Sequence, residues 1–370
     1  MMVYETLPFR VLRNRASNLV GDKVCKVTLG LTLSCNSRCN VCGIWKIYRE
    51  NPSKVKEELS KEDIFRLLDD IGKDLIWIET TGGEPFLRND LEDIMTYIFN
   101  NTNIVAGSIT TNGLLPDKIE RSVKTILGKV PRDKNLTVGV SIDGLRESYA
   151  KIRGLDGFDM ALDSFLRLKA IAKQNKNLTP HIAYTISSYN AGSFNELYDE
   201  LNKNHGIEIN DFSFTLEHQT PFYGIESPEK NKNPYDLFKA KSFEDIEKIN
   251  SLFKRKKSSK LSLQGIKESF YLFYLKKMLD FMDNPAKMVI PCSAGKYSAY
   301  IDPYGSVYPC TMWNVCLGNI KEKKFYEIWR AEKARDVRKM VNAEKCPICW
   351  TPCEAQCSWV MNLESLKTVI

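Results

Sequence analysis

Residues 31–42 read Leu31-Thr32-Leu33-Ser34-Cys35-Asn36-Ser37-Arg38-Cys39-Asn40-Val41-Cys42, so an apolar, β-branched run ends in the spacing C-x3-C-x2-C. Three thiolates packed this tightly in one loop can hold three corners of a cubic iron–sulfur cluster. The fourth iron of such a cluster has no protein ligand and stays open for a small molecule. We therefore predict that Cys35, Cys39 and Cys42 bind a [4Fe-4S] cluster with one open position.

Two other kinds of cysteine site fit this loop less well. Structural zinc sites take four ligands, usually in two pairs, and no fourth Cys or His lies near the loop. A disulfide needs an oxidising compartment, whereas residues 1–6 lack the basic and apolar segments of a secretory signal. We therefore expect a cytoplasmic protein whose thiols are reduced.

The composition is that of a soluble globular protein. Of 370 residues, 43% are hydrophobic and 27% are charged, and the formal net charge is +7. Much of the positive excess lies in runs such as residues 254–257, which we interpret as a solvated helix end rather than a patch for nucleic acid or another anionic partner. The most apolar helical stretch, 269–275, is followed directly by Lys276 and Lys277. It is too short to span a bilayer, so we expect no transmembrane segment.

Apolar runs alternate with amphipathic helical stretches through the first part of the chain. Each run is nearly continuous in apolar or β-branched residues, as expected of strands buried on both faces. Six strand–helix repeats predict an α/β fold, a partial (β/α)6 TIM-like barrel followed by a C-terminal α+β domain. In such barrels the chemistry lies at the C-terminal ends of the strands. The predicted strands are 27–33, 75–80, 104–110, 136–141, 181–186 and 212–216.

Four regions follow from this pattern. We predict an N-terminal extension over 1–24, a barrel core over 25–220, a helical linker on the substrate side over 221–287, and a cysteine-rich domain over 288–370. Helices are expected over 236–257 and 260–282. The aromatic stretch 270–274 either lines an apolar substrate channel or belongs to the core.

Polar motifs follow several of the predicted strands directly. Thr81-Gly82-Gly83-Glu84-Pro85 follows the second strand, and its paired glycines let a ligand approach the backbone closely. A simple Gly-Pro turn is the alternative. Asn112 follows the third strand, Ser141 ends the fourth, and Arg153 lies further downstream. A guanidinium group such as that of Arg153 binds a carboxylate in a bidentate fork.

The cysteine loop, the GGEP motif and the polar strand ends together resemble the radical SAM superfamily. The resemblance implies reductive cleavage of S-adenosylmethionine (SAM) at the open iron, giving a 5′-deoxyadenosyl radical that takes hydrogen from an unactivated C–H bond. It implies an electron donor such as ferredoxin or flavodoxin. It also implies SAM-binding roles for a set of residues: the amino group on Gly82, Gly83, Glu84 and Pro85, the carboxylate on Ser141 and Arg153, the adenosine half on Thr185 and Asn190, and a further contact from Asn112.

A second group of cysteines lies near the C-terminus. Cys292 is followed by Gly305-x4-Cys310 and then by Cys346, Cys349, Cys353 and Cys357. This pattern resembles the auxiliary-cluster domains of the SPASM and twitch subfamilies, which implies one or two further [4Fe-4S] clusters. A zinc ribbon knot is the alternative.

The spacing leaves two ligand sets open. One set uses Cys292, Cys310, Cys346 and Cys349 for a single cluster. The other set divides the cysteines between two clusters, Cys292, Cys310 and Cys357 for one and Cys346, Cys349 and Cys353 for the other, with Cys316 available to complete the first. The sequence assigns no role to Cys25.

The substrate is less defined than the cofactors. His218 follows the sixth predicted strand, where the barrel mouth should lie, and is a candidate to touch substrate. Only 34 residues precede Cys35, so we expect no built-in peptide-recognition domain. A peptide or protein side chain, a small molecule and a lipid all remain candidates for a radical SAM oxidoreductase or transferase. A non-catalytic iron–sulfur or zinc scaffold, or an electron carrier, is the alternative, although neither needs a SAM pocket.

Overall fold

The computed structural model describes residues 23–218, 220–223, 233–255 and 263–361. Most of the predicted N-terminal extension and the end of the 254–257 charge run lie outside these ranges. No helix within them is long and apolar enough to cross a membrane.

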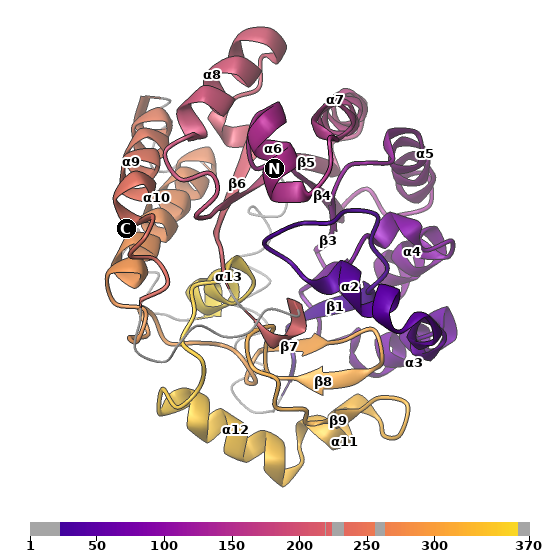
Figure 1. The fold of residues 1–370 in the computed structure, drawn as a ribbon. Coiled ribbons are helices and arrows are strands. Elements are labelled where there is room, and N and C mark those ends of the chain that lie inside the picture. The colour runs from indigo at the N-terminus through magenta and orange to yellow at the C-terminus, as the bar shows by residue number, and fades with distance from the viewer. Residues whose placement is uncertain (1–22, 219, 224–232, 256–262, 362–370) are drawn as a thin grey trace.

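A single nine-stranded sheet forms the centre of the molecule, in the order β6-β5-β4-β3-β2-β1-β7-β8-β9 (Figure 1). The first six strands are parallel to one another, which confirms the predicted α/β fold class. The sheet curves into a partial barrel, and β6 and β9 are its two edges. The six strands are β1 (Lys26–Thr32), β2 (Trp77–Gly82), β3 (Ala106–Thr111), β4 (Asn135–Ser141), β5 (Leu178–Ile186) and β6 (Phe212–Leu216).

Helices cover the outer face of these strands (Figure 1). Helix α3 shows why they form: Ser60 and Asp63 make the expected capping box, and Ile64, Leu67, Leu68 and Ile71 bury one face. The outer helices are α3 (Lys61–Ile71), α4 (Leu91–Asn101), α5 (Pro116–Leu127), α7 (Phe158–Gln174) and α8 (Phe194–His205), and the shorter α2 (Ile44–Glu50) and α6 (Arg146–Arg153) lie in the loops after β1 and β4.

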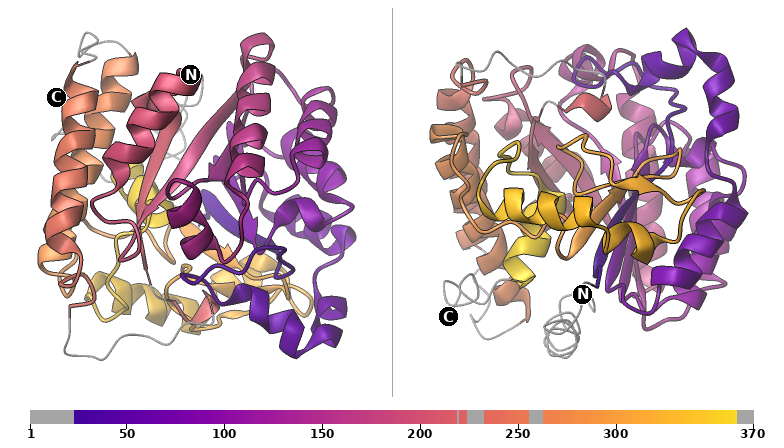
Figure 2. Two further views of the ribbon diagram at one scale, coloured as in Figure 1. Left: turned by 45° about the horizontal axis from the view of Figure 1, so that its top comes forward. Right: turned by 90° about the horizontal axis from the view of Figure 1, so that it is seen from below.

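The C-terminal region is built onto the barrel sheet. Strand β7 (Ser298–Ile301) pairs in parallel with β1, and β8 (Ser306–Tyr308) and β9 (Gly318–Asn319) continue the sheet in antiparallel fashion. Helices α11 (Phe325–Trp329) and α12 (Glu332–Asn342) gather beside them, in orange and yellow in Figure 2. Strand β1 pairs with β2 on one side and with β7 on the other. It therefore links the barrel, which carries the cysteine loop, to the C-terminal region, which carries the second group of cysteines.

Helices α9 (Lys239–Arg255) and α10 (Leu263–Asp283) lie beside β6 (Figure 1). Tyr271 and Tyr274 of α10 are buried in the core, and Tyr274 stacks on Trp350 with ring centroids 5.3 Å apart. Of the two interpretations of the aromatic stretch 270–274, the core one therefore holds for these two side chains.

Helix α13 (Pro352–Met361) lies inside the curve of the sheet (Figure 1). Its Cys357 and Met361 pack against Cys25 and against Ile76 and Val105 at the start of neighbouring strands. Helix α13 therefore fills the N-terminal end of the barrel interior.

A buried lysine ties α13 to the barrel. The Lys26 side chain has no exposed surface, its Nζ lies 2.9 Å from Glu79 Oε2, and it donates to Cys353 O at 2.8 Å. Burial disfavours the charged carboxylate, but the charge of Lys26 holds the pKa of Glu79 below its ordinary value. Ser298 of β7 also donates to Glu354 of α13. Polar contacts therefore join β1, β2, β7 and α13.

We expect Lys26→Met to destabilise the protein by about 3 kcal/mol, since it leaves Glu79 without its cation and Cys353 O without a donor. Urea denaturation measures the change. Lys124→Met removes an exposed i,i+4 pair with Glu120 and is the control, for which we expect no measurable loss. Equal effects of the two substitutions would contradict the role given to Lys26.

Candidate active site

The three loop cysteines lie between the end of β1 and the start of α2. Their thiols are free and half-buried. Burial raises the pKa of Cys42 to about 12, with smaller contributions from the nearby thiols of Cys39 and Cys35. Burial likewise raises the pKa of Cys35 to about 11, with a contribution from Cys39. The thiols of Cys35 and Cys42 therefore become thiolates readily only when a cation binds them, and Cys39 lies near both.

The GGEP segment clamps the start of this loop. Gly83 N donates to Thr32 O and Glu84 N donates to Ser34 O, both at 2.7 Å. A Cβ atom on Gly83 would lie 2.2 Å from Ser34 O, and one on Gly82 would lie 2.1 Å from Thr32 O. The paired glycines therefore make room for the backbone of the cysteine loop, whereas the sequence suggested only the approach of a ligand.

Glu84 joins three loops at the barrel mouth. Its carboxylate is fully buried and accepts hydrogen bonds from Asn112 N at 2.7 Å, Thr111 Oγ1 at 2.9 Å and Phe86 N at 3.1 Å. Burial raises the pKa of Glu84 to about 7, although these donors favour the charged form. Pro85 begins the short 3-10 helix η2 (Pro85–Leu87) and is buried with it. Contact of this carboxylate with the SAM amino group stays a prediction.

Asn112 connects the loop after β3 to the cysteine loop. Its Nδ2 donates to Asn36 Oδ1 at 2.7 Å and lies 3.9 Å from Cys35 Sγ. Its Oδ1 accepts from Leu114 N, which shapes the Asn-Gly turn. Asn112 therefore supports the loop of the first cysteine and lies near the predicted cluster.

Arg153 lies beside the middle cysteine. Its Nη1 is 3.8 Å from Cys39 Sγ, and Nη2 pairs with Asp143. Its backbone oxygen accepts from Arg38 N and from Ser37 Oγ, so α6 also supports the cysteine loop. The buried Nε of Arg153 makes no hydrogen bond with the described residues.

Asp143 organises the loops after β4 and β5. Besides Arg153, its carboxylate accepts from Thr185 N at 2.7 Å, and its backbone oxygen accepts from Asn190 Nδ2 at 2.8 Å. Asn190 also donates to Thr185 O at 2.7 Å, so both hydrogens of its amide are used within the protein. Ser141, 8% exposed, ends β4 at the same edge. These loops meet as predicted, and Asn190 shapes them.

His218 lies after β6, as the sequence suggested. Its Nδ1 is 3.2 Å from Leu216 O, and its ring centroid is 5.5 Å from that of Tyr223. Burial lowers the pKa of His218, so the ring is neutral near pH 7. Tyr223 O accepts from Gly43 N at 2.6 Å, directly after Cys42. The His218–Tyr223 pair therefore lies close to the third cysteine.

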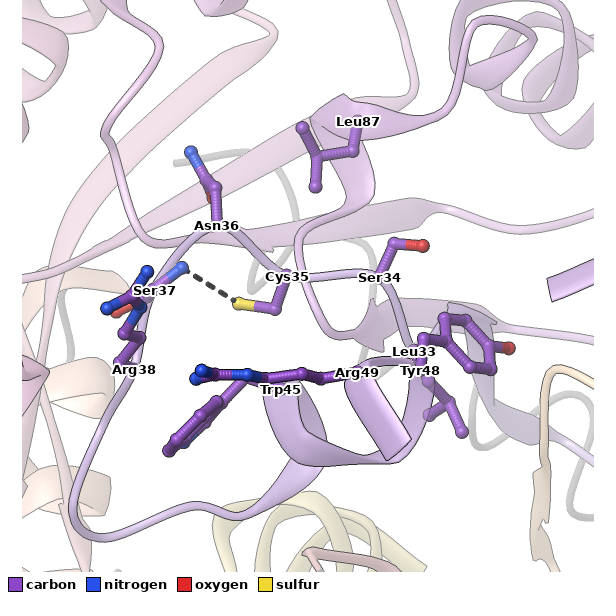
Figure 3. A pocket seen from close by; sticks show the side chains of 10 residues that line it. All are labelled: Leu33, Ser34, Cys35, Asn36, Ser37, Arg38, Trp45, Tyr48, Arg49 and Leu87. Carbon is purple, nitrogen blue, oxygen red and sulfur yellow. Dashed lines mark hydrogen bonds between the residues drawn. The ribbon is translucent and has the colours of Figure 1, made fainter. Parts of the chain in front are cut away.

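A hollow of about 360 Å³ opens beside the cysteine loop (Figure 3). Ser37 N donates to Cys35 Sγ at 3.5 Å, and the thiol points into the hollow near Trp45 and Arg49. Trp45 also donates from Nε1 to Cys39 O at 3.3 Å. Trp45 was not predicted to belong to the site, although an aromatic residue three positions after Cys42 was a visible signal in the sequence.

The C-terminal cysteines separate into distinct environments. Cys292, Cys310 and Cys349 pack together with Ala294, Met312 and Trp313. Cys346 raises the pKa of both Cys292 and Cys349, after the larger effects of burial and Glu354, so it faces the same group.

The remaining C-terminal cysteines lie elsewhere. Cys353 borders Lys26 and Glu79, and Cys357 packs against Cys25. Cys316 is 3.5 Å from Gly318 O. The arrangement favours the single set of Cys292, Cys310, Cys346 and Cys349 over the set that divides the cysteines between two clusters.

The residues present fit an iron–sulfur cluster with SAM. In the ranges that the structure describes, no three His, Cys, Asp or Glu side chains are arranged to hold a metal ion. A [4Fe-4S] cubane is held by Cys thiolates, which are the side chains that Cys35, Cys39 and Cys42 supply. The unpaired Nε of Arg153 beside Cys39 supplies a buried donor of the kind that a carboxylate ligand needs.

Comparison with known proteins agrees with this geometry. A family described as "Radical SAM superfamily" matches residues 30–201, and the SPASM "Iron-sulfur cluster-binding domain" matches residues 292–357. The chain therefore belongs to the radical SAM superfamily and carries a SPASM domain. Its cofactors are accordingly SAM, a SAM-binding [4Fe-4S] cluster and one or two auxiliary iron–sulfur clusters.

Several relatives match over most of the chain. The Fe-coproporphyrin III synthase of Methanosarcina barkeri is 25% identical over 83% of this chain and 74% of its own length. The AdoMet-dependent heme synthase of the same organism is 26% identical over 86% of both chains. The GTP 3′,8-cyclase of Aliarcobacter butzleri is 31% identical, but the match covers only 39% of this chain and 42% of the cyclase.

Solved structures support the fold. The crystal structure of Streptococcus suis SuiB superposes with a TM-score of 0.57 at 17% identity, covering 92% of this chain and 75% of SuiB. At this identity the likeness shows a shared fold.

Gly83→Ala tests the clamp between the GGEP segment and the cysteine loop. We expect it to displace the loop and to lower the iron bound at the three cysteines, because the new methyl group would overlap Ser34 O. Iron and sulfide analysis after anaerobic reconstitution measures this loss. Gly128→Ala is the control, since its Cβ would meet only ordinary contacts of 3.5 Å. Wild-type iron content in Gly83→Ala would show that the clamp is dispensable.

Proposed function

We propose that this protein cleaves SAM reductively and uses the resulting 5′-deoxyadenosyl radical to remove hydrogen from an unactivated C–H bond of its substrate. Cys35, Cys39 and Cys42 hold the cluster that supplies the electron for this cleavage. The observation that carries the proposal is the buried, unpaired Nε of Arg153 near Cys39. An electron carrier or a zinc scaffold needs no such donor.

Different residues of the chain bind different parts of SAM. Arg153, held by Asp143, presents its guanidinium edge to the SAM carboxylate. Glu84 and the Gly82–Gly83 backbone take the amino group, with Pro85 fixing the turn. Ser141, Thr185, Asn112 and Asn190 line the edge where the loops after β3, β4 and β5 meet. A buried site of this kind protects a radical from water and side reactions.

A second iron–sulfur site lies in the SPASM domain. We propose that Cys292, Cys310, Cys346 and Cys349 ligate one auxiliary [4Fe-4S] cluster, because the first two pack together with Cys349 and the half-buried Cys346 raises the pKa of Cys292 and Cys349. A cluster held by these residues would supply an electron acceptor for a substrate radical or an anchor for the substrate. Cys353 and Cys357 then contribute to the packing of α13 in the barrel.

For the substrate we propose a carboxylated tetrapyrrole. Two relatives named for porphyrin and heme synthesis match more than four fifths of the chain. Aromatic side chains also gather next to the His218–Tyr223 pair, where Phe222 packs edge-on against Tyr300 and Tyr308 with ring centroids 5.0 and 4.7 Å apart. Aromatic rings of this kind suit a planar macrocycle. A peptide, as bound by SuiB, is the alternative.

Fe-coproporphyrin III and a mixed tryptic peptide pool are the probes for the substrate class. Each is added to anaerobic enzyme with SAM and dithionite. We expect the porphyrin to raise the rate of 5′-deoxyadenosine formation and to change in mass. Stimulation and modification by the peptides alone would move the assignment to a peptide substrate.

Cys39→Ala tests the first cluster. We expect loss of SAM cleavage, because two cysteines hold the cluster poorly, with the auxiliary iron retained. Chromatographic assay of 5′-deoxyadenosine and iron analysis give the two readouts. Unchanged SAM cleavage in this variant would contradict the assignment of Cys39 as a ligand of the first cluster.

Cys349→Ala and Cys357→Ala separate the two ligand sets. Wild-type protein should hold about eight irons, four in each cubane. We expect Cys349→Ala to lose the auxiliary iron, while Cys357→Ala keeps it and loses only stability. SAM cleavage without substrate should persist in both. Loss of cluster iron in Cys357→Ala would restore the two-cluster arrangement.

A further inference from the structure

Exposed positive side chains surround the outer side of the cysteine loop. Arg38 lies within the loop, Lys46 and Arg49 on α2, and Lys54 and Lys56 on the 3-10 helix η1 (Pro52–Glu57), and all five are exposed. None of them pairs with an acidic residue anywhere in the described ranges. We call these five residues the basic face.

Trp45 connects the basic face to the cysteine loop. Its ring lies 5.5 Å from Lys46 Nζ and 6.0 Å from the Arg49 guanidinium carbon. The same side chain donates to the backbone oxygen of Cys39 at 3.3 Å. Trp45, Arg38 and Arg49 also line the hollow into which the Cys35 thiol points (Figure 3). Part of the basic face therefore lies directly beside the cysteine loop.

We propose that the basic face docks a small acidic electron-carrier protein that reduces the cluster site. This inference rests on the proposed function, which needs one electron for each SAM cleaved. The carrier loses one electron and the cluster site gains it, with no bond made or broken in the transfer. Opposite charges raise the rate of encounter, and interfaces for electron transfer are small.

The composition of the face favours a protein over another polyanion. Half-buried Trp45 and Val55, which is 42% exposed, place apolar surface among the five cations. Exposed Glu50 and Glu57 interrupt the positive charge. A phosphate backbone prefers an unbroken cationic track, whereas protein interfaces combine an aromatic anchor with a polar rim.

A triple charge reversal tests the proposal. Lys46→Glu, Lys54→Glu and Lys56→Glu are combined in one variant, because these side chains lie outside the hollow and bind no predicted ligand. The matched control combines Lys129→Glu, Lys173→Glu and Lys176→Glu, three exposed lysines near the C-terminal ends of α5 and α7. These helix ends lie near the N-terminal ends of the barrel strands, opposite the cysteine loop, since the helices run antiparallel to the strands.

Two reductants separate docking from chemistry. With dithionite, which needs no docking site, both variants should form 5′-deoxyadenosine at the wild-type rate. With a limiting amount of reduced plant-type ferredoxin, we expect the basic-face variant to be about tenfold slower and less sensitive to salt. Titration calorimetry with oxidised ferredoxin should show the matching loss of affinity without relying on turnover.

Other outcomes are equally decisive. Wild-type affinity and rate with ferredoxin in the basic-face variant, or an equal loss in the control, would overturn the proposal. Intact ferredoxin binding with lost binding to duplex DNA or to anionic phosphatidylserine vesicles would assign the face to a different partner. Absence of SAM cleavage with dithionite in wild-type protein would refute the proposed function itself, independently of the docking surface.

Discussion

Two backbone hydrogen bonds hold the cysteine loop to the neighbouring strand end, from Gly83 N to Thr32 O and from Glu84 N to Ser34 O. They exist because two glycines let the chains approach to a distance that no side chain permits. Glu84 also accepts a hydrogen bond from the backbone N–H of Asn112 in the loop after β3. The Asn112 side chain in turn donates to Asn36, next to the first cysteine. The positions of the cysteines thus depend on backbone contact more than on the thiols themselves.

Strand β1 connects the main parts of the molecule to one another. Its C-terminal end leads into the cysteine loop, and its edge pairs with β7 of the SPASM domain. At its N-terminal end Lys26 binds Glu79 and the backbone of α13. A buried ion pair adds little net stability but is costly to break, so it specifies how the helix sits in the barrel.

Much of this architecture could be predicted from the sequence, because buried parallel strands are continuous apolar runs and the motifs follow them directly. The start of β5 was missed: Pro180 argues against a strand, yet it pairs only with β4, and β6 begins pairing at Ile182, so the missing N–H of Pro180 costs nothing. In the sequence, Asp143-Gly144 is an ordinary turn dipeptide, whereas contacts with Arg153, Thr185 and Asn190 make Asp143 central to the site.

Long-range contacts could not be predicted from local sequence patterns. The pairing of β7 with β1 and the meeting of Lys26 with α13 join residues hundreds of positions apart, and no periodicity reports such contacts. The grouping of the C-terminal cysteines has the same origin: spacing allowed two ligand sets, and only packing separates Cys349 from Cys357.

The placement of α13 also has a consequence for the order of assembly during synthesis. Lys26 and Cys353 are 327 positions apart, so a ribosome adding roughly 5–20 residues per second needs about 16 to 65 s between them. Through that interval the barrel strands exist without the helix that fills them. The loop cysteines and the barrel strands are therefore synthesised well before the ten-residue helix α13, which then fills the N-terminal end of the barrel interior.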